Sequence, residues 1–165
     1  GDKIVVMNNA VVEQFGTPQQ IYDKPATMFV ADFIGSPSMN FLRFDGALDE
    51  GATSVDLNGQ TLAVPKQLQG ASGKLVFGVR PEHVMLSDSG NYRGEVLATE
   101  YLGTTQIITL DTPNGELKAR IDSAQLAAIG EKVALNFQAP KITLFDETTG
   151  LALRSSLNHE VLAHG

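Results

Sequence analysis

The 165-residue sequence contains no cysteine and no tryptophan. Without cysteine the chain forms neither a disulfide nor a thiolate metal site, which fits a reducing compartment. No apolar run approaches the roughly 20 residues that a membrane-spanning helix needs. The N-terminus also lacks the charged and apolar regions of a secretory signal peptide. These absences lead us to expect a soluble, cytoplasmic protein.

Basic residues are scarce, with 12 lysines and arginines against 19 aspartates and glutamates and a formal net charge of -7. An acidic surface repels phosphate backbones, so we expect no nucleic-acid partner and no general binding to anionic membranes. Hydrophobic residues make up 42% of the chain, which supports a sizeable core and excludes a disordered protein. The length suits one full domain together with part of another.

The first part of the chain predicts a hairpin followed by two short helices. Two β-prone runs separated by turn residues indicate the hairpin over residues 2–15. Thr17 is a suitable N-cap for the first helix, and Gln20 stands at the capping-box position. The second helix is expected to begin near Ala26 and to end at Gly35.

Beyond Ser36 the pattern changes to short β-prone runs separated by turn residues. Asn-Gly pairs at residues 58–59 and 114–115 predict hairpins, and one short helix is expected over residues 123–129. Gly103 interrupts a long strand and should allow a bulge or a tight bend. The expected strands are residues 41–48, 53–57, 60–64, 75–80, 84–86, 93–101, 106–111, 116–121, 132–137, 142–145 and 151–153. This many strands predict a mainly β fold, either a sandwich or a small closed barrel.

A domain boundary is expected near Ser36. One hairpin and two short helices bury too little apolar surface to be stable alone. Residues 1–35 are therefore predicted to be the tail of a preceding domain. Residues 36–165 are long enough to form a domain of their own.

The sequence offers no complete catalytic or metal-binding motif. The glycine-rich run at residues 70–75 lacks the first glycine and the hydroxyl residue of a phosphate-binding loop. His83, His159 and His164 do not have the spacing of a metal site, and no Gly-x-Ser-x-Gly elbow is present. We therefore predict no catalytic residue, no metal and no cofactor site in this chain.

One charged cluster stands out at the end of an expected strand, in the run Gly-Val-Arg-Pro-Glu-His at residues 78–83. In one interpretation, a contact between Arg80 and a carboxylate fixes the end of the strand. In the other, Arg80, Glu82 and His83 form a charged corner that contacts a regulatory partner, a small anion or another subunit. The residues alone leave both interpretations open.

Several motifs in series resemble one known family. The chain is similar to the ATPase subunits of carbohydrate-type ABC importers, those for maltose, glycerol-3-phosphate and multiple sugars. The similarity begins at the end of their nucleotide-binding domain and covers most of residues 1–153. The motifs that carry it are Gly1 to Met7, Glu13 to Pro18, Ile21 to Pro25, Phe29 to Phe41, Gly78 to His83, Glu100 to Gly103 and Leu144 to Gly150.

The resemblance implies a specific architecture. Residues 36–165 would form an oligonucleotide-binding (OB)-like barrel, the transport-associated (TOBE) regulatory domain, and residues 1–35 would be the remnant of an α/β ATPase domain. ATP and magnesium would bind in that ATPase domain, whose phosphate loop, signature motif and switch histidine would precede Gly1. The implied partners are a second copy of the subunit, the membrane permease subunits and a phosphotransferase-system regulatory protein. The implied location is the inner face of the cell membrane.

Three other functions are alternatives to a regulatory and dimerisation module. An effector-sensing barrel that binds a small anion or a sugar phosphate is the main alternative, with Lys74, Arg80 and His83 as the nearby cationic donors. A nucleic-acid-binding barrel would need a basic groove with exposed aromatic residues, which the net charge opposes. A hydrolytic enzyme is the least favoured, because no catalytic motif is present.

Overall fold

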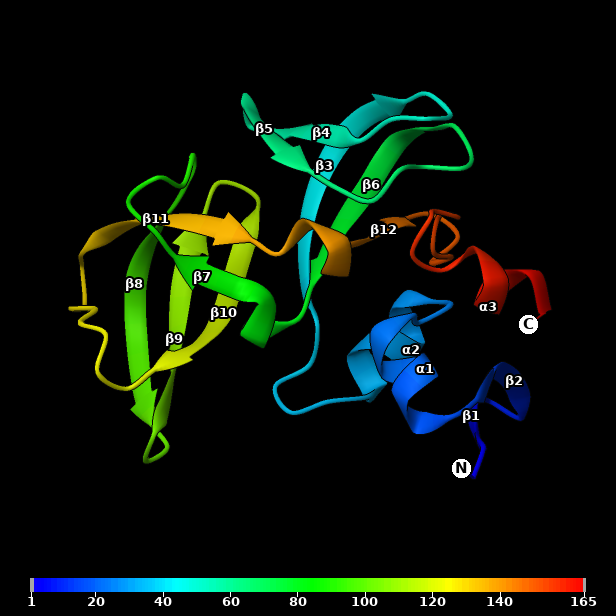
Figure 1. Cartoon of the computed structure of the whole chain (residues 1–165), viewed down its shortest axis with the longest axis horizontal. Coiled ribbons are helices and arrows are strands. Elements are labelled where there is room, and N and C mark those ends of the chain that lie inside the picture. The colour runs from blue at the N-terminus through cyan, green and yellow to red at the C-terminus, as the bar shows by residue number, and fades with distance from the viewer. Residues whose placement is uncertain (1, 165) are drawn as a thin grey trace.

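The computed structural model describes residues 2–164 and is mainly β (Figure 1). The first elements are the expected hairpin and helices, namely β1 (Ile4–Asn8), β2 (Val11–Gly16), α1 (Pro18–Asp23) and α2 (Met28–Phe33). Thr17 caps α1 through the expected capping box with Gln20. The Thr27 side chain accepts a hydrogen bond from the amide of Val30 and so caps α2.

The remainder of the described chain consists of short strands and three short helical segments. They are β3 (Asn40–Leu48), β4 (Ser54–Leu57), β5 (Gln60–Ala63), β6 (Ala71–Val79), η1 (Pro81–His83), β7 (Val84–Leu86), β8 (Tyr92–Tyr101), β9 (Thr105–Thr112), β10 (Gly115–Asp122), β11 (Lys132–Phe137), η2 (Ala139–Lys141), β12 (Thr143–Asp146) and α3 (His159–His164). One sheet has the strand order β10-β9-β8-β11-β7, a second has the order β12-β6-β3, and β4 pairs with β5.

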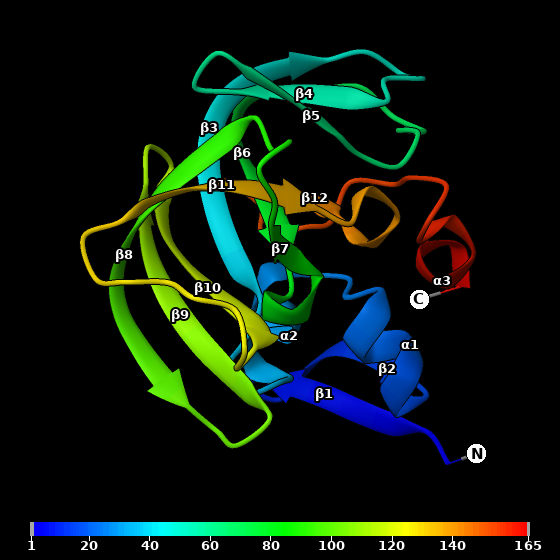
Figure 2. The ribbon, with the colours of Figure 1, turned by 60° about the vertical axis from the view of Figure 1, so that its left-hand side comes forward.

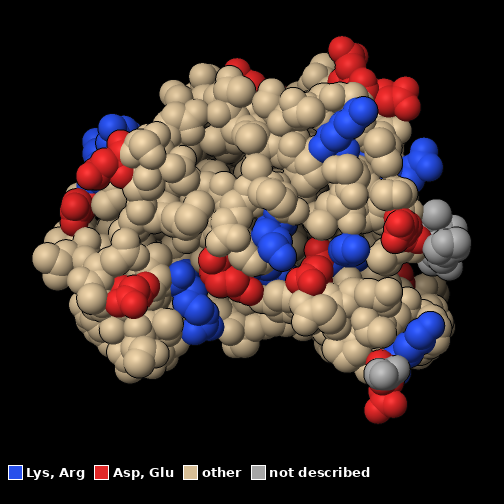
Figure 3. All heavy atoms as spheres, viewed as in Figure 1, with Lys and Arg blue, Asp and Glu red and all other residues tan. Residues whose placement is uncertain are grey.

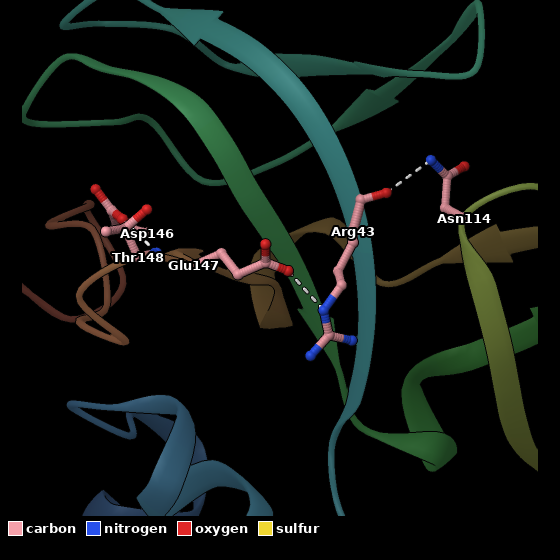
Figure 4. Close-up of polar contacts among 5 residues, drawn as sticks. All are labelled: Arg43, Asn114, Asp146, Glu147 and Thr148. Atoms are coloured by element: carbon pink, nitrogen blue, oxygen red, sulfur yellow. Dashed lines mark hydrogen bonds and ion pairs between the residues drawn. The ribbon is translucent and has the colours of Figure 1, made fainter.

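Side chains join the two larger sheets where β3 runs beside β10. The side-chain amide of Asn40 donates to the carbonyl of Lys118 and accepts from the Lys118 backbone N–H, both at 2.8 Å. Further along, the Arg43 N–H donates to the carbonyl of Asn114, whose side-chain amide donates back to the carbonyl of Arg43 at 2.9 Å (Figure 4). These contacts nearly close the strands into a barrel (Figure 2). The barrel expected from the frequency of strands is confirmed.

The main hydrophobic core fills the interior of this barrel. Successive side chains of a strand face opposite sides, so alternate residues of β9 are buried. The fully buried apolar side chains of the core include Leu42, Leu57, Leu75, Phe77, Tyr92, Ile108, Leu117 and Leu135. One smaller apolar cluster lies within the N-terminal segment, and another joins α2 to β6 and β12.

Both expected Asn-Gly hairpins form, but their turns differ. Residues 58 and 59 make the turn between β4 and β5, with φ angles of 53° and 82°, as a type I′ turn requires. In the second hairpin Thr112 pairs with Gly115. The turn there consists of residues 113–114, so the glycine lies one position later than the Asn-Gly signal implies.

The helix expected over residues 123–129 is wrong. The segment between β10 and β11 forms turns and irregular backbone instead. The buried side-chain amide of Gln106 donates to the carbonyl of Gln125 at 2.7 Å and holds this segment at the end of the barrel. Leu126 is 91% exposed and Ile129 is 71% exposed. A helix this short needs a buried apolar face to be stable, and these side chains do not supply one.

The chain returns to the N-terminal segment after β12. The Met28 N–H donates to the carbonyl of Gly150 at 2.8 Å, and the Ala152 N–H donates to the carbonyl of Ala26 at 2.9 Å. The strand expected at residues 151–153 is therefore represented by isolated bridges. These contacts join both sides of the domain boundary predicted near Ser36, and that boundary stays a prediction.

Gly103 lies in the turn between β8 and β9 with a φ of +87°. The expected break in the strand is present as a hairpin turn. Because a β-branched side chain is strained in this backbone conformation, Gly103→Val should cost roughly 1–3 kcal/mol of unfolding free energy. Urea unfolding measures this cost, and Gly103→Asn serves as a control that tolerates positive φ. A midpoint equal to that of the wild type would contradict the prediction.

Candidate functional site

Arg80 stands at the corner between β6 and η1 and is almost completely buried, with 1% of its surface exposed. Arg80 directly follows strand β6, and Pro81 at the first position of η1 ends the strand. The side chain reaches across to the N-terminal helices. A buried guanidinium requires hydrogen-bond acceptors for its N–H groups, and those helices provide them.

The guanidinium donates to three backbone carbonyls. Its Nη1 donates to the carbonyls of Ala31 at 2.9 Å and Ile34 at 2.7 Å, and its Nη2 donates to the carbonyl of Tyr22 at 2.9 Å. These carbonyls lie at the C-terminal ends of α1 and α2, where the last carbonyls of a helix lack partners within the helix. Arg80 therefore acts as a shared C-terminal cap for both helices.

Tyr22 and Glu82 complete the corner. The guanidinium of Arg80 lies over the Tyr22 ring, 4.2 Å from its centroid, a favourable cation–π arrangement. The Tyr22 hydroxyl donates to the carboxylate of Glu82. Gly35 passes close by with a φ of +106°, and a Cβ atom there would lie 3.3 Å from Nη1 of Arg80. The corner is therefore tightly packed by groups from both sides of the predicted boundary.

Electrostatics agree with this geometry. Burial lowers the pKa of Arg80, while Tyr22, Glu82 and Asp23 act in the opposite direction. The guanidinium nevertheless keeps its charge, because arginine stays protonated in proteins. Among residues 2–164 no carboxylate forms a salt bridge with Arg80. The end of the strand is thus fixed by backbone carbonyls rather than by the carboxylate contact considered from the sequence.

His83 lies at the far end of η1 and is half-buried. Its carbonyl accepts a hydrogen bond from the Gln138 N–H at 3.0 Å, and burial lowers the pKa of its imidazole. The structure thus brings Arg80 and Glu82 together around Tyr22 and places His83 beside them on the same turn. Their role as a contact site for a regulatory partner stays a prediction.

Lys74 does not belong to this corner. It lies six residues before Arg80 on β6, a separation of about 20 Å at the usual rise of a strand. It lines a shallow groove with Arg43 and Glu147 instead. The cationic donors considered for an anionic effector therefore do not converge.

A second polar cluster was missed by sequence reasoning. Nε of Arg43 on β3 lies 2.6 Å from a carboxylate oxygen of Glu147, in the turn after β12 (Figure 4). That turn is held by Asp146, whose carboxylate accepts from the Thr148 N–H. Arg43 is 57% exposed, so the pair is a surface ion pair worth little stability. No motif in the sequence links these residues, which are far apart along the chain.

The face of the molecule drawn in Figure 3 shows no concentration of positive charge that would mark a polyanion site. Lysines and arginines are interspersed with aspartates and glutamates on the face in Figure 3. Within residues 2–164 no group of histidine and acidic side chains is arranged to hold a metal ion. No helix in the same range is both long enough and apolar enough to cross a bilayer.

The Tyr22–Glu82 pair should make the stability of the fold depend on pH in the alkaline range. Burial, then the hydrogen bond to Glu82, raises the pKa of Tyr22 from 10.0 to about 12. The pKa of Tyr22 is higher in the folded state than in the unfolded state. The protonated hydroxyl therefore contributes its full stability to the fold below about pH 10, and this contribution is lost as the pH rises to 12. The unfolding free energy of the wild type should therefore fall more steeply in this window than that of Tyr22→Phe. Urea unfolding tests this, with the exposed Tyr101→Phe as control; equal slopes for wild type and Tyr22→Phe would refute it.

Comparison with known families assigns the barrel. Residues 35–84 match the family model of the MalK OB fold domain, and residues 77–145 match that of the TOBE domain. A solved structure of the cytoplasmic molybdate-binding protein ModG has a TM-score of 0.52 at 21% identity, covering 64% of this chain and 94% of that one. This likeness shows the fold alone. The barrel is thus an OB-type domain of the TOBE class.

The sequence relatives of the chain narrow its family assignment. The sn-glycerol-3-phosphate import ATP-binding protein UgpC of Ruegeria sp. is 39% identical, covering 91% of this chain and 42% of the relative. The multiple sugar-binding transport ATP-binding protein MsmK of Streptococcus mutans is 37% identical, with coverages of 93% and 46%. The trehalose/maltose import ATP-binding protein MalK of Thermococcus litoralis is 36% identical, with coverages of 93% and 44%.

The chain belongs to this family of ATP-binding subunits of sugar-type ABC importers, which confirms the resemblance seen in the sequence. It spans less than half the length of these curated relatives. What it contains is the region of the TOBE and OB domains together with the preceding hairpin and helices.

Proposed function

We propose that this chain is the regulatory and dimerisation part of an ATP-binding subunit that powers import of a sugar or a related solute. Residues 36–165 form the regulatory domain, and residues 1–35 are the end of the ATP-binding domain. The chain itself catalyses nothing in this proposal. In this proposal ATP and magnesium bind in the ATP-binding domain; the relatives' names describe those proteins as ATP-binding.

The Arg80 corner carries the proposal. A side chain of the barrel caps both helices of the N-terminal segment through three hydrogen bonds. Such a joint makes the barrel and the helices move together, because separation would break three hydrogen bonds and the packing around the guanidinium at once. A partner that holds the barrel therefore also restrains the domain from which α1 and α2 come.

The proposed partners follow from this role. A second copy of the subunit pairs with the barrel, and permease subunits hold the complex at the cytoplasmic face of the membrane. A phosphotransferase-system regulatory protein is a further candidate that would act through the barrel. The effector-sensing alternative receives no support from the site, because both terminal nitrogens of Arg80 already donate to backbone carbonyls and Lys74 is distant.

The test uses the complete subunit with its permease in proteoliposomes. Glu82→Lys should change the regulation of transport, or the association of the subunits, while the protein still folds, because the three hydrogen bonds of Arg80 remain. Glu116→Lys on β10 provides the same charge change away from the corner. If transport, its regulation and subunit association all match the wild type in Glu82→Lys, the proposed role of the corner is refuted.

A further inference from the structure

One edge of strand β8 has no partner strand over its second half. Strand β11 pairs with β8 only over residues 92–95, and Val96 bonds with the segment that precedes β11. From there to Tyr101, β8 is paired through β9 on one side only among the described residues. Figures 1 and 2 show this β8–β9 hairpin extending beyond β11. We call residues 97–101 the β8 edge.

The hydrogen-bond pattern shows which backbone groups the β8 edge presents. The Leu102 N–H donates to the carbonyl of Thr105 at 2.8 Å and closes the hairpin. Hydrogen-bonded and non-hydrogen-bonded pairs alternate in an antiparallel ladder. Since Tyr101 pairs with Gln106 and Thr99 pairs with Ile108, both fall at non-hydrogen-bonded positions. Their N–H and C=O groups therefore point away from β9 toward the open edge.

The side chains of the β8 edge offer little protection against strand pairing. Proteins usually block an open edge with lysine, proline or a bulge. Residues 97–101 contain neither proline nor a basic residue, and a bulge occurs only at their start, where Leu97 is the extra residue. Leu97 is 43% exposed and Tyr101 is 66% exposed. The edge thus combines free backbone groups with exposed apolar side chains.

We propose that the β8 edge is the surface through which two copies of this chain pair, as antiparallel strands related by a twofold axis at Thr99. This inference rests on the proposed pairing of the subunits and names its location. A twofold axis at Thr99 places Leu97 opposite Tyr101 of the partner subunit. It places Glu100 opposite Ala98 of the partner subunit, so the only charged residue of the edge does not face its own copy. The edge is therefore self-complementary, which favours a second copy over an unrelated peptide.

The absence of cysteine makes a direct test possible. The Cα atoms of a hydrogen-bonded antiparallel pair lie about 5.5 Å apart, which suits a disulfide. Thr99→Cys should therefore form a disulfide-linked dimer under mild oxidation. Val11→Cys, an exposed position on β2 outside the barrel, should crosslink at least tenfold more slowly. Equal rates for the two variants, or no dimer with Thr99→Cys, would overturn the proposal.

A second measurement removes the backbone donor alone. Thr99→Pro deletes an N–H that the β8–β9 ladder does not use, and proline is tolerated at an open edge. Sedimentation over a concentration series should show the dimer dissociation constant rising at least tenfold, with the melting temperature nearly unchanged. A wild-type chain that stays monomeric also overturns the proposal. A dimer that persists unchanged in Thr99→Pro rejects this surface but leaves the proposed function standing, since the Glu82→Lys transport assay judges that separately.

Discussion

Replacement of Arg80 by methionine should lower the melting temperature of this chain by roughly 5–15 °C. Methionine fills similar space but donates no hydrogen bond, so the carbonyls of Tyr22, Ala31 and Ile34 lose a partner that they share. Unsatisfied buried carbonyls are costly, although removal of a buried charge recovers part of the loss. We expect a net cost of roughly 2–4 kcal/mol. Thermal unfolding followed by circular dichroism measures the effect.

Arg43→Met is the matched control for this substitution. Arg43 is an exposed arginine with one ion pair, and such pairs contribute at most about 1 kcal/mol. Arg80→Lys adds a second comparison, because lysine keeps the charge without the planar guanidinium that reaches three carbonyls. If Arg80→Met melts within about 2 °C of Arg43→Met, the cap described here contributes nothing measurable to the fold.

Gly78→Ala should destabilise the barrel by roughly 2–3 kcal/mol, at the upper end of the usual cost of overpacking. Gly78 lies near the end of β6, the central strand of the β12-β6-β3 sheet, and is paired with Phe41 on one side and Thr143 on the other. A Cβ atom there would lie 2.7 Å from Sδ of Met39 and from the Phe145 ring, and 2.9 Å from the Thr143 carbonyl. Because one of these neighbours is sheet backbone, the site relaxes poorly.

Gly46→Ala on the neighbouring strand β3 separates crowding from the general effect of losing a glycine. A Cβ atom at Gly46 meets mainly the edge of the Phe44 ring at 2.9 Å, and a side chain moves more easily than a strand. The loss of unfolded-state freedom favours both alanine variants equally. In urea unfolding, the free energy of unfolding of Gly78→Ala should therefore be lower than that of Gly46→Ala by at least about 1 kcal/mol, the lower end of the usual cost of overpacking. Equal urea midpoints for the two variants would contradict the prediction, because they would show that the neighbours of Gly78 move to make room for the added methyl group.

The fold was largely predictable because its signals are local. Turn residues divide the chain into short strands, and caps such as Thr17 mark the helix starts. The helix expected over residues 123–129 failed because helix-forming residues in that segment had no apolar surface to cover. Its conformation is set by Gln106, from a different strand. Tertiary contacts of this kind cannot be predicted from a short stretch of the sequence.

The candidate site was predictable only in part. The strand exit at residues 78–83 identified Arg80 and Glu82, but not the groups that they contact. The acceptors of Arg80 are backbone carbonyls, which every residue possesses, and they lie 46 to 58 residues earlier in the chain. Tyr22 carried no signal that linked it to Glu82. Such partners become visible only once the helices and the barrel are placed together.

The shared cap also bears on the order in which the chain acquires structure. Helices α1 and α2 contain six residues each, and isolated helices of this length are unstable in water. Their last carbonyls find their partner only after Arg80 has been synthesised and β6 has taken its place in the barrel. The two helices therefore leave the ribosome before the residue that caps their ends. Until the barrel forms, the C-terminal ends of both helices lack the partner that Arg80 supplies, so the structure of the N-terminal segment depends on the chain that follows it.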